Sequence, residues 1–396
     1  MSNQELIELG QKYLLNTYGR LPVAMVKGQG THLYDADGND YLDFVGGLAV
    51  NSLGHCHPDI VKAIEEQANR LLHCSNLYWI EPQIKLAKLL VDNSCLAQVF
   101  FGNSGSEANE GAIKLARKYA SLKYGQERHE IITMKQSFHG RTLAALAATG
   151  QEKFHQDFQP LPQGFTYVPF GNLEALKEAL GPKTCAVMVE PIQGEGGVNV
   201  PTMDFMQEVW KLCQEKDVLL ILDEVQVGMG RTGTLFAYEQ FGVEPDILTL
   251  AKALGGGVAI GAFLAKEQVT AAFKPGDHGS TFGGNPLATA AGLAAVNAIL
   301  QDGFLEQVKE KGLYLQNQLE KLQTKYSFIK EVRGLGLIWG MELDRPGADV
   351  VSKCMEDGLL INCTNSTVLR LLPPLIVTKE EIDVAVAIMD KALSSV

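Results

Sequence analysis

Residues 246–257, DILTLAKALGGG, decide the fold class and raise the question of function. An apolar run ends at one lysine, Lys252, and three consecutive glycines follow at 255–257. An ammonium group is strongly hydrated and is seldom buried without a partner. We therefore expect a core strand that presents Lys252 to a ligand, with glycines that let the ligand approach the backbone closely.

Five other apolar runs resemble this one and predict further strands of the same sheet, at residues 98–102, 130–134, 185–190, 218–224 and 261–265. Continuous Val, Ile and Leu runs are typical of strands covered on both faces, as in a mostly parallel sheet. Amphipathic stretches lie between them and predict helices. The sequence thus predicts an α/β fold in which helices cover both faces of a mostly parallel central sheet.

The length of 396 residues predicts more than one packed unit, since a single core stops growing at about 250–300 residues. After about residue 295 the pattern changes to a long charged helix, short strands and a final helix from about Glu380. We expect a large α/β domain at 61–295 and a smaller α+β domain at 296–396. Residues 1–60, with a hairpin around Asp37 and Gly38, form a segment that packs on these domains.

Composition excludes several classes of protein. The net charge of −12 argues against a nucleic-acid or anionic-membrane surface. The seven cysteines are scattered without a C-x-x-C pair, which argues against disulfides and structural zinc and favours a reducing compartment. The cluster His55-Cys56-His57 lacks zinc-site spacing, so we expect no metal. We find no signal-peptide pattern and expect a cytoplasmic protein, or one in an organelle after loss of a presequence.

Asp223 ends the apolar run at 218–222, and Gln226 follows three positions later. In a parallel sheet the carboxyl ends of strands open onto the ligand crevice. A carboxylate there is costly unless a cation or good donors meet it. The alternative is that Asp223 caps the following helix.

The loop Asn103–Ser106 joins a predicted strand to a predicted helix. Ser104 and Glu107 fit a capping box. Free N–H groups and the positive end of the helix dipole suit a phosphate, although a plain capped helix explains the same residues. The loop matches neither nucleotide-binding glycine motif.

Lys252 has three possible roles: to bind a phosphate, to pair with Asp223, or to bond covalently to an aldehyde with an amine activated by desolvation. Taken together, the residues suggest one ligand with a phosphate at Gly105 and Ser106, a cationic ring nitrogen at Asp223 and an aldehyde at Lys252. That ligand is pyridoxal phosphate.

Nine stretches, in this order, carry a resemblance to a known family. They are YLDFVGGLAVNSLGHCHP, SNLYWIEPQ, FFGNSGSEANEGAIKLAR, FHGRTLAALAATG, EPIQGEGGV, LILDEVQVGMGRTG, PDILTLAKALGGG, HGSTFGGNPLA and VLRLLPPL. Over essentially its whole length the chain resembles the class III pyridoxal-phosphate aminotransferases of fold type I. Within that class it is similar to the acetylornithine aminotransferases of arginine biosynthesis.

The resemblance implies how the cofactor is held. Lys252 would bond to it and move the reacting proton, Asp223 would keep the ring nitrogen protonated, and Phe138 would stack on the ring. Thr281 would reach the phosphate from a partner subunit, so the working unit would be at least a homodimer. The complete set of implied cofactor-binding residues is Gly105, Ser106, Phe138, Asp223, Glu224, Val225, Gln226, Lys252 and Thr281.

The resemblance also implies the substrate-binding residues Arg141, Glu195, Ser280 and Arg370. Arg370 would bind the α-carboxylate of glutamate in a bidentate pair. Glu195 would neutralise Arg370 when an ω-amine without a nearby carboxylate binds instead. Arg141 would hold the far carboxylate, and Ser280 would lie near the substrate.

The implied reaction is transfer of an amino group between N2-acetyl-L-ornithine and 2-oxoglutarate. Leu48 stands near the place of a tyrosine typical of ornithine-specific relatives, and a leucine leaves apolar space for an acetyl group. Ornithine, succinylornithine, diaminopimelate-derived compounds and 4-aminobutyrate remain as alternative substrates. An aminomutase with the same cofactor site and a binding protein without catalysis are the rival functions.

Overall fold

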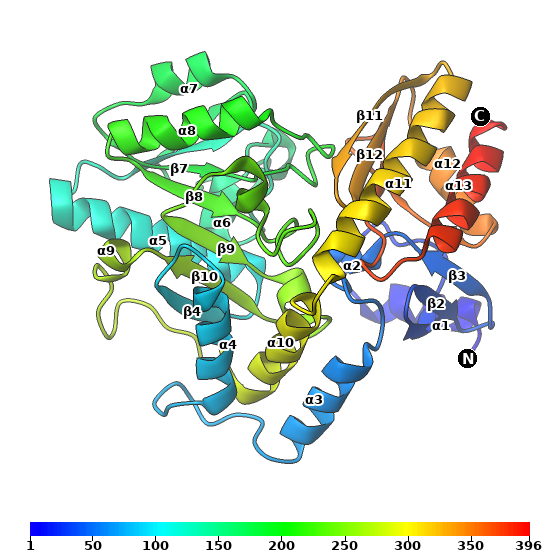
Figure 1. Cartoon of the computed structure of the whole chain (residues 1–396), viewed down its shortest axis with the longest axis horizontal. Helices are drawn as coiled ribbons and strands as arrows, with labels where there is room; N and C mark the ends of the chain where they lie inside the picture. Colours follow the sequence, from blue (N-terminus) through cyan, green and yellow to red (C-terminus); the bar gives the residue numbers. More distant parts are fainter.

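The computed structural model describes all 396 residues. Its central sheet has seven strands in the order β4-β10-β9-β8-β7-β5-β6 (Figure 1). These are β4 (Gln98–Gly102), β5 (Glu130–Met134), β6 (Phe165–Val168), β7 (Thr184–Val189), β8 (Leu219–Asp223), β9 (Ile247–Leu250) and β10 (Gly261–Ala265). Strand β10 runs antiparallel to both neighbours, and the remaining pairs are parallel. The prediction of a mostly parallel sheet is confirmed.

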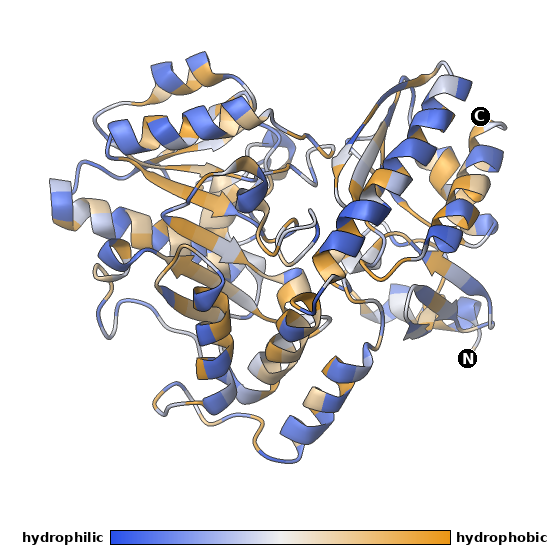
Figure 2. Ribbon diagram, viewed as in Figure 1, coloured by the Kyte–Doolittle hydropathy of each residue, from blue (hydrophilic) through white to orange (hydrophobic).

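Both faces of this sheet are buried, as the continuous apolar runs predict. Along β8, Leu220 and Leu222 join one hydrophobic cluster, while Leu219 and Ile221 join another on the opposite face. Successive side chains of a strand point to opposite faces, so a strand buried on both sides needs apolar residues at every position. Figure 2 shows these strands as a predominantly apolar layer between helices whose outer surfaces are polar.

The helices of the large unit pack on these two faces. Helix α5 contributes Ala112, Ile113 and Leu115 to one cluster, and α4 and α10 contribute to the other. The helical segments before residue 300 are α1 (Asn3–Tyr13), α2 (Gly46–Ala49), α3 (Pro58–Ala68), α4 (Glu81–Asp92), α5 (Gly105–Tyr124), α6 (Leu143–Ala148), η1 (Glu152–Phe154), α7 (Leu173–Ala179), α8 (Met203–Glu215), η2 (Ala237–Phe241), η3 (Lys252–Gly255), α9 (Glu267–Thr270) and α10 (Pro286–Ile299).

The N-terminal segment forms a small sheet that also takes a strand from the far end of the chain. Strands β1 (Met25–Gln29), β2 (His32–Asp35) and β3 (Asp40–Asp43) are antiparallel, and β2 and β3 make the hairpin predicted around Asp37 and Gly38. Strand β13 (Leu359–Leu360) pairs in parallel with β3. The first sixty residues are therefore tied to the C-terminal part of the chain.

The C-terminal part has its own sheet in the order β11-β12-β15-β14. Its elements are α11 (Phe304–Lys325), β11 (Ile329–Leu335), β12 (Ile338–Leu343), α12 (Ala348–Glu356), β14 (Asn362–Thr364), β15 (Val368–Leu371) and α13 (Lys379–Leu393). A separate hydrophobic cluster lies between this sheet and the three helices and includes Phe44 from the N-terminal segment. Figure 1 shows this unit beside the central sheet, with the N-terminal strands against it.

The division at residues 60 and 295 stays a prediction. The hydrophobic cluster of the central sheet includes Leu53 and Ile60 at one boundary, and Val296 and Ile299 of α10 beyond the other. None of the helices is by itself long and apolar enough to span a bilayer, whereas α10 and α11, which meet at an angle of 70°, satisfy the length and composition criteria as a pair.

Candidate active site

A cavity of about 400 Å³ opens at the carboxyl ends of the parallel strands. Ligand sites typically measure about 300–1,000 Å³. Its wall is made by residues that follow β4, β5, β7, β8 and β9, as expected for an open α/β sheet. The residues that line it are Val50, Asn103, Ser104, Gly105, Ser106, Asn109, Phe138, His139, Gly140, Glu190, Glu195, Asp223, Val225, Gln226, Ala251, Lys252, Gly257, Val258, Ala259 and Ile260.

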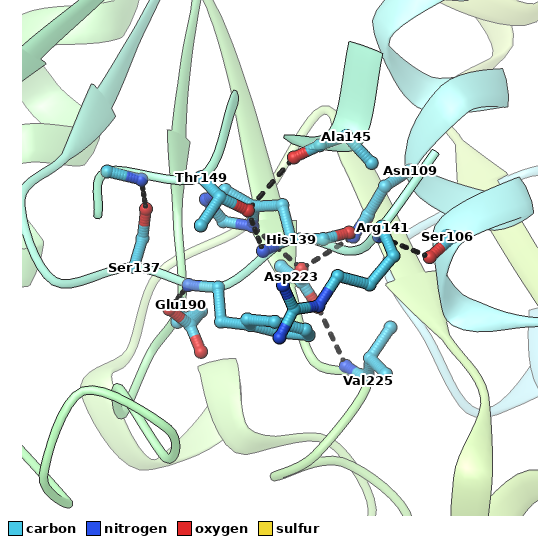
Figure 3. A network of polar contacts seen from close by, with 12 residues as sticks. Ser106, Asn109, Ser137, His139, Arg141, Ala145, Thr149, Glu190, Asp223 and Val225 are labelled. Carbon is cyan, nitrogen blue, oxygen red and sulfur yellow. Dashed lines mark hydrogen bonds and ion pairs between the residues drawn. The ribbon is translucent and has the colours of Figure 1, made fainter. Parts of the chain in front are cut away.

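Asp223, the last residue of β8, is buried in this wall, and both of its carboxylate oxygens have hydrogen-bond partners. Its Oδ2 accepts from Asn109 Nδ2 at 2.7 Å and lies 2.8 Å from His139 Nδ1. Its Oδ1 accepts from the backbone N–H of Val225 at 3.0 Å. Figure 3 shows this network, with Asn109, His139 and Val225 arranged around the carboxylate. The donors hold Asp223 as a fixed, desolvated negative charge beside the cavity.

Lys252 lies in the same wall, at the first residue of η3, with a left-handed backbone (φ 47°). Left-handed backbone is strained for a residue other than glycine, and such strain clusters at functional sites. Burial lowers the pKa of Lys252 below its ordinary value, and this effect outweighs the opposing charge of Glu195. A larger fraction of this amine is therefore neutral and nucleophilic than in an exposed lysine.

The turn at the start of α5 requires a glycine at position 105. A Cβ at this position would lie 2.7 Å from Val225 Cγ1, which is closer than real contacts allow. Ser104 caps the helix by accepting from the Glu107 N–H at 3.2 Å. The predicted capping box is half formed, because the Glu107 carboxylate accepts from the N–H of Asn103 rather than that of Ser104.

Arg370 of β15 is completely buried and contacts Glu195. Its Nη1 donates to Glu195 Oε1 at 2.8 Å and to Gln226 Oε1 at 3.2 Å, and its Nε donates to Asn362 Oδ1 at 3.3 Å. Burial works to raise the pKa of Glu195, but the charge and hydrogen bond of Arg370 outweigh burial, and the pKa lies below its ordinary value. The Nη2 group of Arg370 is buried without a partner, so one donor remains for a ligand.

Phe138 lines the cavity, and Arg141 lies close to it on the outer side. The Arg141 guanidinium is 5.4 Å from the Phe138 ring centroid and 4.0 Å from that of Phe154. The Arg141 side chain is exposed, and its backbone N–H donates to Ser106 Oγ at 3.2 Å. The cation is thus placed at the rim by stacking on aromatic faces.

Comparisons with known proteins agree with this geometry. The family described as aminotransferase class-III matches residues 13–393. The chain belongs to the class-III aminotransferases.

Among similar class-III aminotransferases are two acetylornithine aminotransferases. That of Caldanaerobacter subterraneus subsp. tengcongensis is 59% identical over 99% of this chain and 100% of its own, and that of Methanocaldococcus jannaschii is 57% identical over 100% of both. Similar crystal structures include ornithine aminotransferase from Toxoplasma gondii with partial occupancy of pyridoxal phosphate (TM-score 0.97, 35% identity, 100% of this chain and 95% of that one). Another is acetylornithine aminotransferase from Elizabethkingia anophelis (TM-score 0.90, 33% identity, 100% of both chains).

The cofactor of this class-III aminotransferase is pyridoxal phosphate, and the cavity fits it. A fixed carboxylate, a lysine of lowered pKa and the first turn of α5 all border one space. Gly105 lets the first turn of α5 pack closely against Val225, with which any Cβ would collide. Each group of the cofactor would find a residue of matching chemistry.

Five of the predicted site residues are not among those that line this cavity: Arg141 and Arg370, which contact its lining residues as described above, and Glu224, Ser280 and Thr281. The Glu224 carboxylate turns away and accepts from the N–H groups of Ala237 and Tyr238 at 2.6 and 2.7 Å, and burial raises its pKa to about 8. Ser280 and Thr281 line a separate hollow with Phe282, and Ser280 Oγ accepts from Asn103 Nδ2 at 3.1 Å. A single chain of this class-III aminotransferase therefore does not bring Thr281 to its own cavity.

Sequence reasoning missed Asn109, His139 and Glu190. Both Asn109 and His139 bind Asp223, and Glu190 is buried in the cavity wall, where its Oε2 accepts from the Phe138 N–H at 2.9 Å. Burial, reinforced by the neighbouring charge of Asp223, raises the pKa of Glu190 well above its ordinary value. All three residues stand within the family-like stretches, and this was the available signal.

Proposed function

We propose that this aminotransferase moves the ω-amino group of N2-acetyl-L-ornithine to 2-oxoglutarate. The products are N-acetyl-L-glutamate 5-semialdehyde and L-glutamate, as in arginine biosynthesis. The observation that carries this proposal is the contact between Arg370 and Glu195 beside Lys252. Such an enzyme must bind a dicarboxylic amino acid and an ω-amine in one cavity, and an arginine with a removable counter-charge allows both.

Bound pyridoxal phosphate supplies an electron sink that stabilises a carbanion at the reacting carbon. We assign Lys252 to covalent attachment and to carrying the proton, because its lowered pKa favours the neutral amine that both tasks need. Asp223 keeps the ring nitrogen protonated by opposing its charge.

The positions of residues in the wall support the remaining cofactor contacts of this proposal. We assign Phe138 and Val225 to the two faces of the ring and Gln226 to its phenolic oxygen. The N–H groups of Gly105 and Ser106 bind the phosphate at the start of α5. Glu224 fixes the η2 backbone rather than the cofactor.

Two arginines select the substrate in this proposal. Arg141, exposed at the rim, binds the carboxylate far from the reacting carbon. Arg370 binds the α-carboxylate of glutamate, for which its unpaired Nη2 provides the second donor of a bidentate pair. When the ω-amine binds, Glu195 stays on Arg370 and prevents an uncompensated buried charge.

The acyl preference rests on two observations. The acetylornithine aminotransferases of two organisms are 59% and 57% identical to this chain, over 99% and 100% of its length. Leu48 is 40% exposed on a left-handed turn at 46–49 next to Val50 of the cavity wall. It offers apolar contact to an acetyl group and no hydrogen bond to a free α-amine.

We also propose that the protein is a homodimer whose active sites are shared between the subunits, and that it is cytoplasmic. Three large apolar side chains are strongly exposed: Leu77 (86%), Trp79 (92%) and Phe282 (62%). A second copy of the chain would cover them. The neighbouring Ser280 and Thr281 would then face the cavity of the partner subunit. The scattered cysteines favour the reducing cytoplasm.

Steady-state kinetics with acetylornithine, succinylornithine, ornithine and 4-aminobutyrate, each with 2-oxoglutarate, test the proposal. We expect the highest kcat/KM for acetylornithine and no turnover without the keto acid. A higher kcat/KM for free ornithine would overturn the substrate assignment. Isomerisation of an amino aldehyde without 2-oxoglutarate would indicate an aminomutase.

A further inference from the structure

Strand β14 contacts both members of the Glu195–Arg370 pair. Asn362 Oδ1 accepts from Arg370 Nε at 3.3 Å, and Thr364 Oγ1 donates to the carbonyl oxygen of Glu195. Side chains two positions apart in a strand point to the same face, and Asn362 lies directly opposite Arg370 in the β14–β15 pair. One face of β14 therefore reaches the side chain of Arg370 and the backbone of residue 195.

The backbone around Glu195 is also fixed on its other sides. Arg333 of β11 donates to the carbonyl oxygens of Gly197 and Val198, at 2.7–3.1 Å. Gln193 and Asn199 exchange backbone hydrogen bonds at 3.0 and 3.1 Å, and Gln193 Nε2 donates to the carbonyl oxygen of Lys135 at 2.9 Å. The loop at 193–199 is thus pinned before, at and after residue 195.

The side chain of Glu195 is much less constrained than this backbone. It is 27% exposed, and its hydrogen bonds are those with Arg370 at 2.8 Å and Gln226 at 3.5 Å. Releasing Arg370 therefore requires a side-chain rotation, without rearrangement of the loop.

We infer that Thr364 is a positioning residue that sets how strongly Glu195 competes with a substrate carboxylate for Arg370. The inference rests on the roles proposed above for Glu195 and Arg370. Thr364, Arg333 and Arg370 all belong to the four-stranded sheet β11-β12-β15-β14. The backbone of Glu195 is therefore tied to the sheet that carries Arg370. The distance between these two residues then stays constant if this sheet shifts relative to the central sheet.

Loss of the Thr364 hydroxyl loosens residue 195 and weakens its hold on Arg370. The affinity for a dicarboxylate, which needs Arg370 free, then rises, and the half-reaction with acetylornithine, which needs Arg370 covered, slows. Loss of one neutral hydrogen bond corresponds to a change of about fivefold in the dicarboxylate affinity and in the acetylornithine rate. Thr364 is 8% exposed, so water does not readily replace its hydroxyl.

The test uses Thr364→Val, Thr364→Ser and the control Thr367→Val, in the wild-type and Glu195→Ala backgrounds. Thr367 lies in the same hairpin, and its hydroxyl contacts only the Asn365 carbonyl oxygen, at 3.5 Å. Two quantities are measured on holoenzyme: the Kd of glutarate by calorimetry, and single-turnover rates with acetylornithine and with glutamate. Thr364→Ala is the second disruptive variant, should valine prevent folding.

We expect Thr364→Val to bind glutarate about fivefold more tightly and to slow only the acetylornithine half-reaction, while Thr364→Ser and Thr367→Val behave as wild type. In the Glu195→Ala background Thr364→Val should change nothing, since no carboxylate is left to position. Equal slowing of both half-reactions, or the same effect of Thr364→Val in both backgrounds, would overturn the positioning role alone. Unchanged glutarate affinity in Glu195→Ala itself would overturn the proposed pair, and the inference with it.

Discussion

His139 Nδ1 lies 2.8 Å from Asp223 Oδ2, and both side chains are buried. The other ring nitrogen, Nε2, is buried without a partner, so Nδ1 is the nitrogen through which this ring acts. With Asn109, His139 turns a carboxylate at the end of an apolar strand into a fixed charge at the cavity wall.

Replacement of His139 by Ala should therefore weaken cofactor binding. The change removes one of two side-chain donors from a buried carboxylate, a loss of about 1.5–3 kcal/mol for a charged hydrogen bond. We expect the Kd of pyridoxal phosphate, measured by fluorescence titration of apoenzyme, to rise about 10- to 100-fold. His155→Ala is the control, because His155 bonds only the carbonyl oxygen of Leu146. Equal affinities of the two variants would contradict the role of the Asp223 network.

Glu195→Ala should favour glutamate over acetylornithine. Arg370 is fully buried, and without Glu195 it keeps a charge that only Gln226 and Asn362 contact. Because Glu195 is partly exposed, solvent screens part of the pair, and we expect a loss of about 1–3 kcal/mol in the acetylornithine half-reaction. Single-turnover rates measure this loss. The variant should also have a lower Tm than wild type, and glutarate should restore the Tm by filling the place that Glu195 leaves empty. A uniform slowing of both half-reactions would refute this account.

Lys252 should make the stability of the apoenzyme depend on pH. Its pKa in the folded protein is lowered by burial, so the unfolded chain binds more protons between this lowered pKa and about 10.5. Folding is penalised by this lysine at neutral pH, and the penalty fades as pH rises through its folded pKa toward 10.5. Apo Lys252→Met should have a higher Tm than apo wild type at pH 7, with the difference shrinking at higher pH. A difference that stays constant from pH 7 to 10.5 would rule out the shift.

Gly105→Ala should displace the first turn of α5. The new Cβ would lie 2.7 and 3.0 Å from the two methyl carbons of Val225, a stiff side chain that cannot move aside cheaply. We expect at least a tenfold loss in cofactor affinity, and partial recovery in Gly105→Ala/Val225→Ala, where the colliding methyl groups are removed. The absence of any recovery in the double variant would place the damage elsewhere.

The sequence predicts the central sheet well because burial on both faces leaves a continuous apolar run in every strand. It also predicts that Asp223 and Lys252 meet, since the carboxyl ends of neighbouring parallel strands share one edge. The short stretch at 359–364 was harder. It looks like one strand, but β13 pairs with β3, more than three hundred residues earlier, and β14 joins another sheet.

The sequence pattern also does not predict which groups the polar side chains bind. Glu107 binds the Asn103 N–H where a capping box predicts that of Ser104, and Glu224 reaches backbone groups at 237 and 238. Such contacts depend on tertiary placement. His139 and Asn109 could not be matched to Asp223 from spacing, because they lie 84 and 114 residues from it.

Mass spectrometry after borohydride reduction of the holoenzyme tests the central claim most directly. Reduction fixes any lysine–pyridoxal phosphate bond, and trypsin does not cleave after the modified lysine. We predict one labelled peptide, residues 232–266, with the label on Lys252. Label on another lysine such as Lys135 or Lys153, with Lys252 unmodified, would contradict the account.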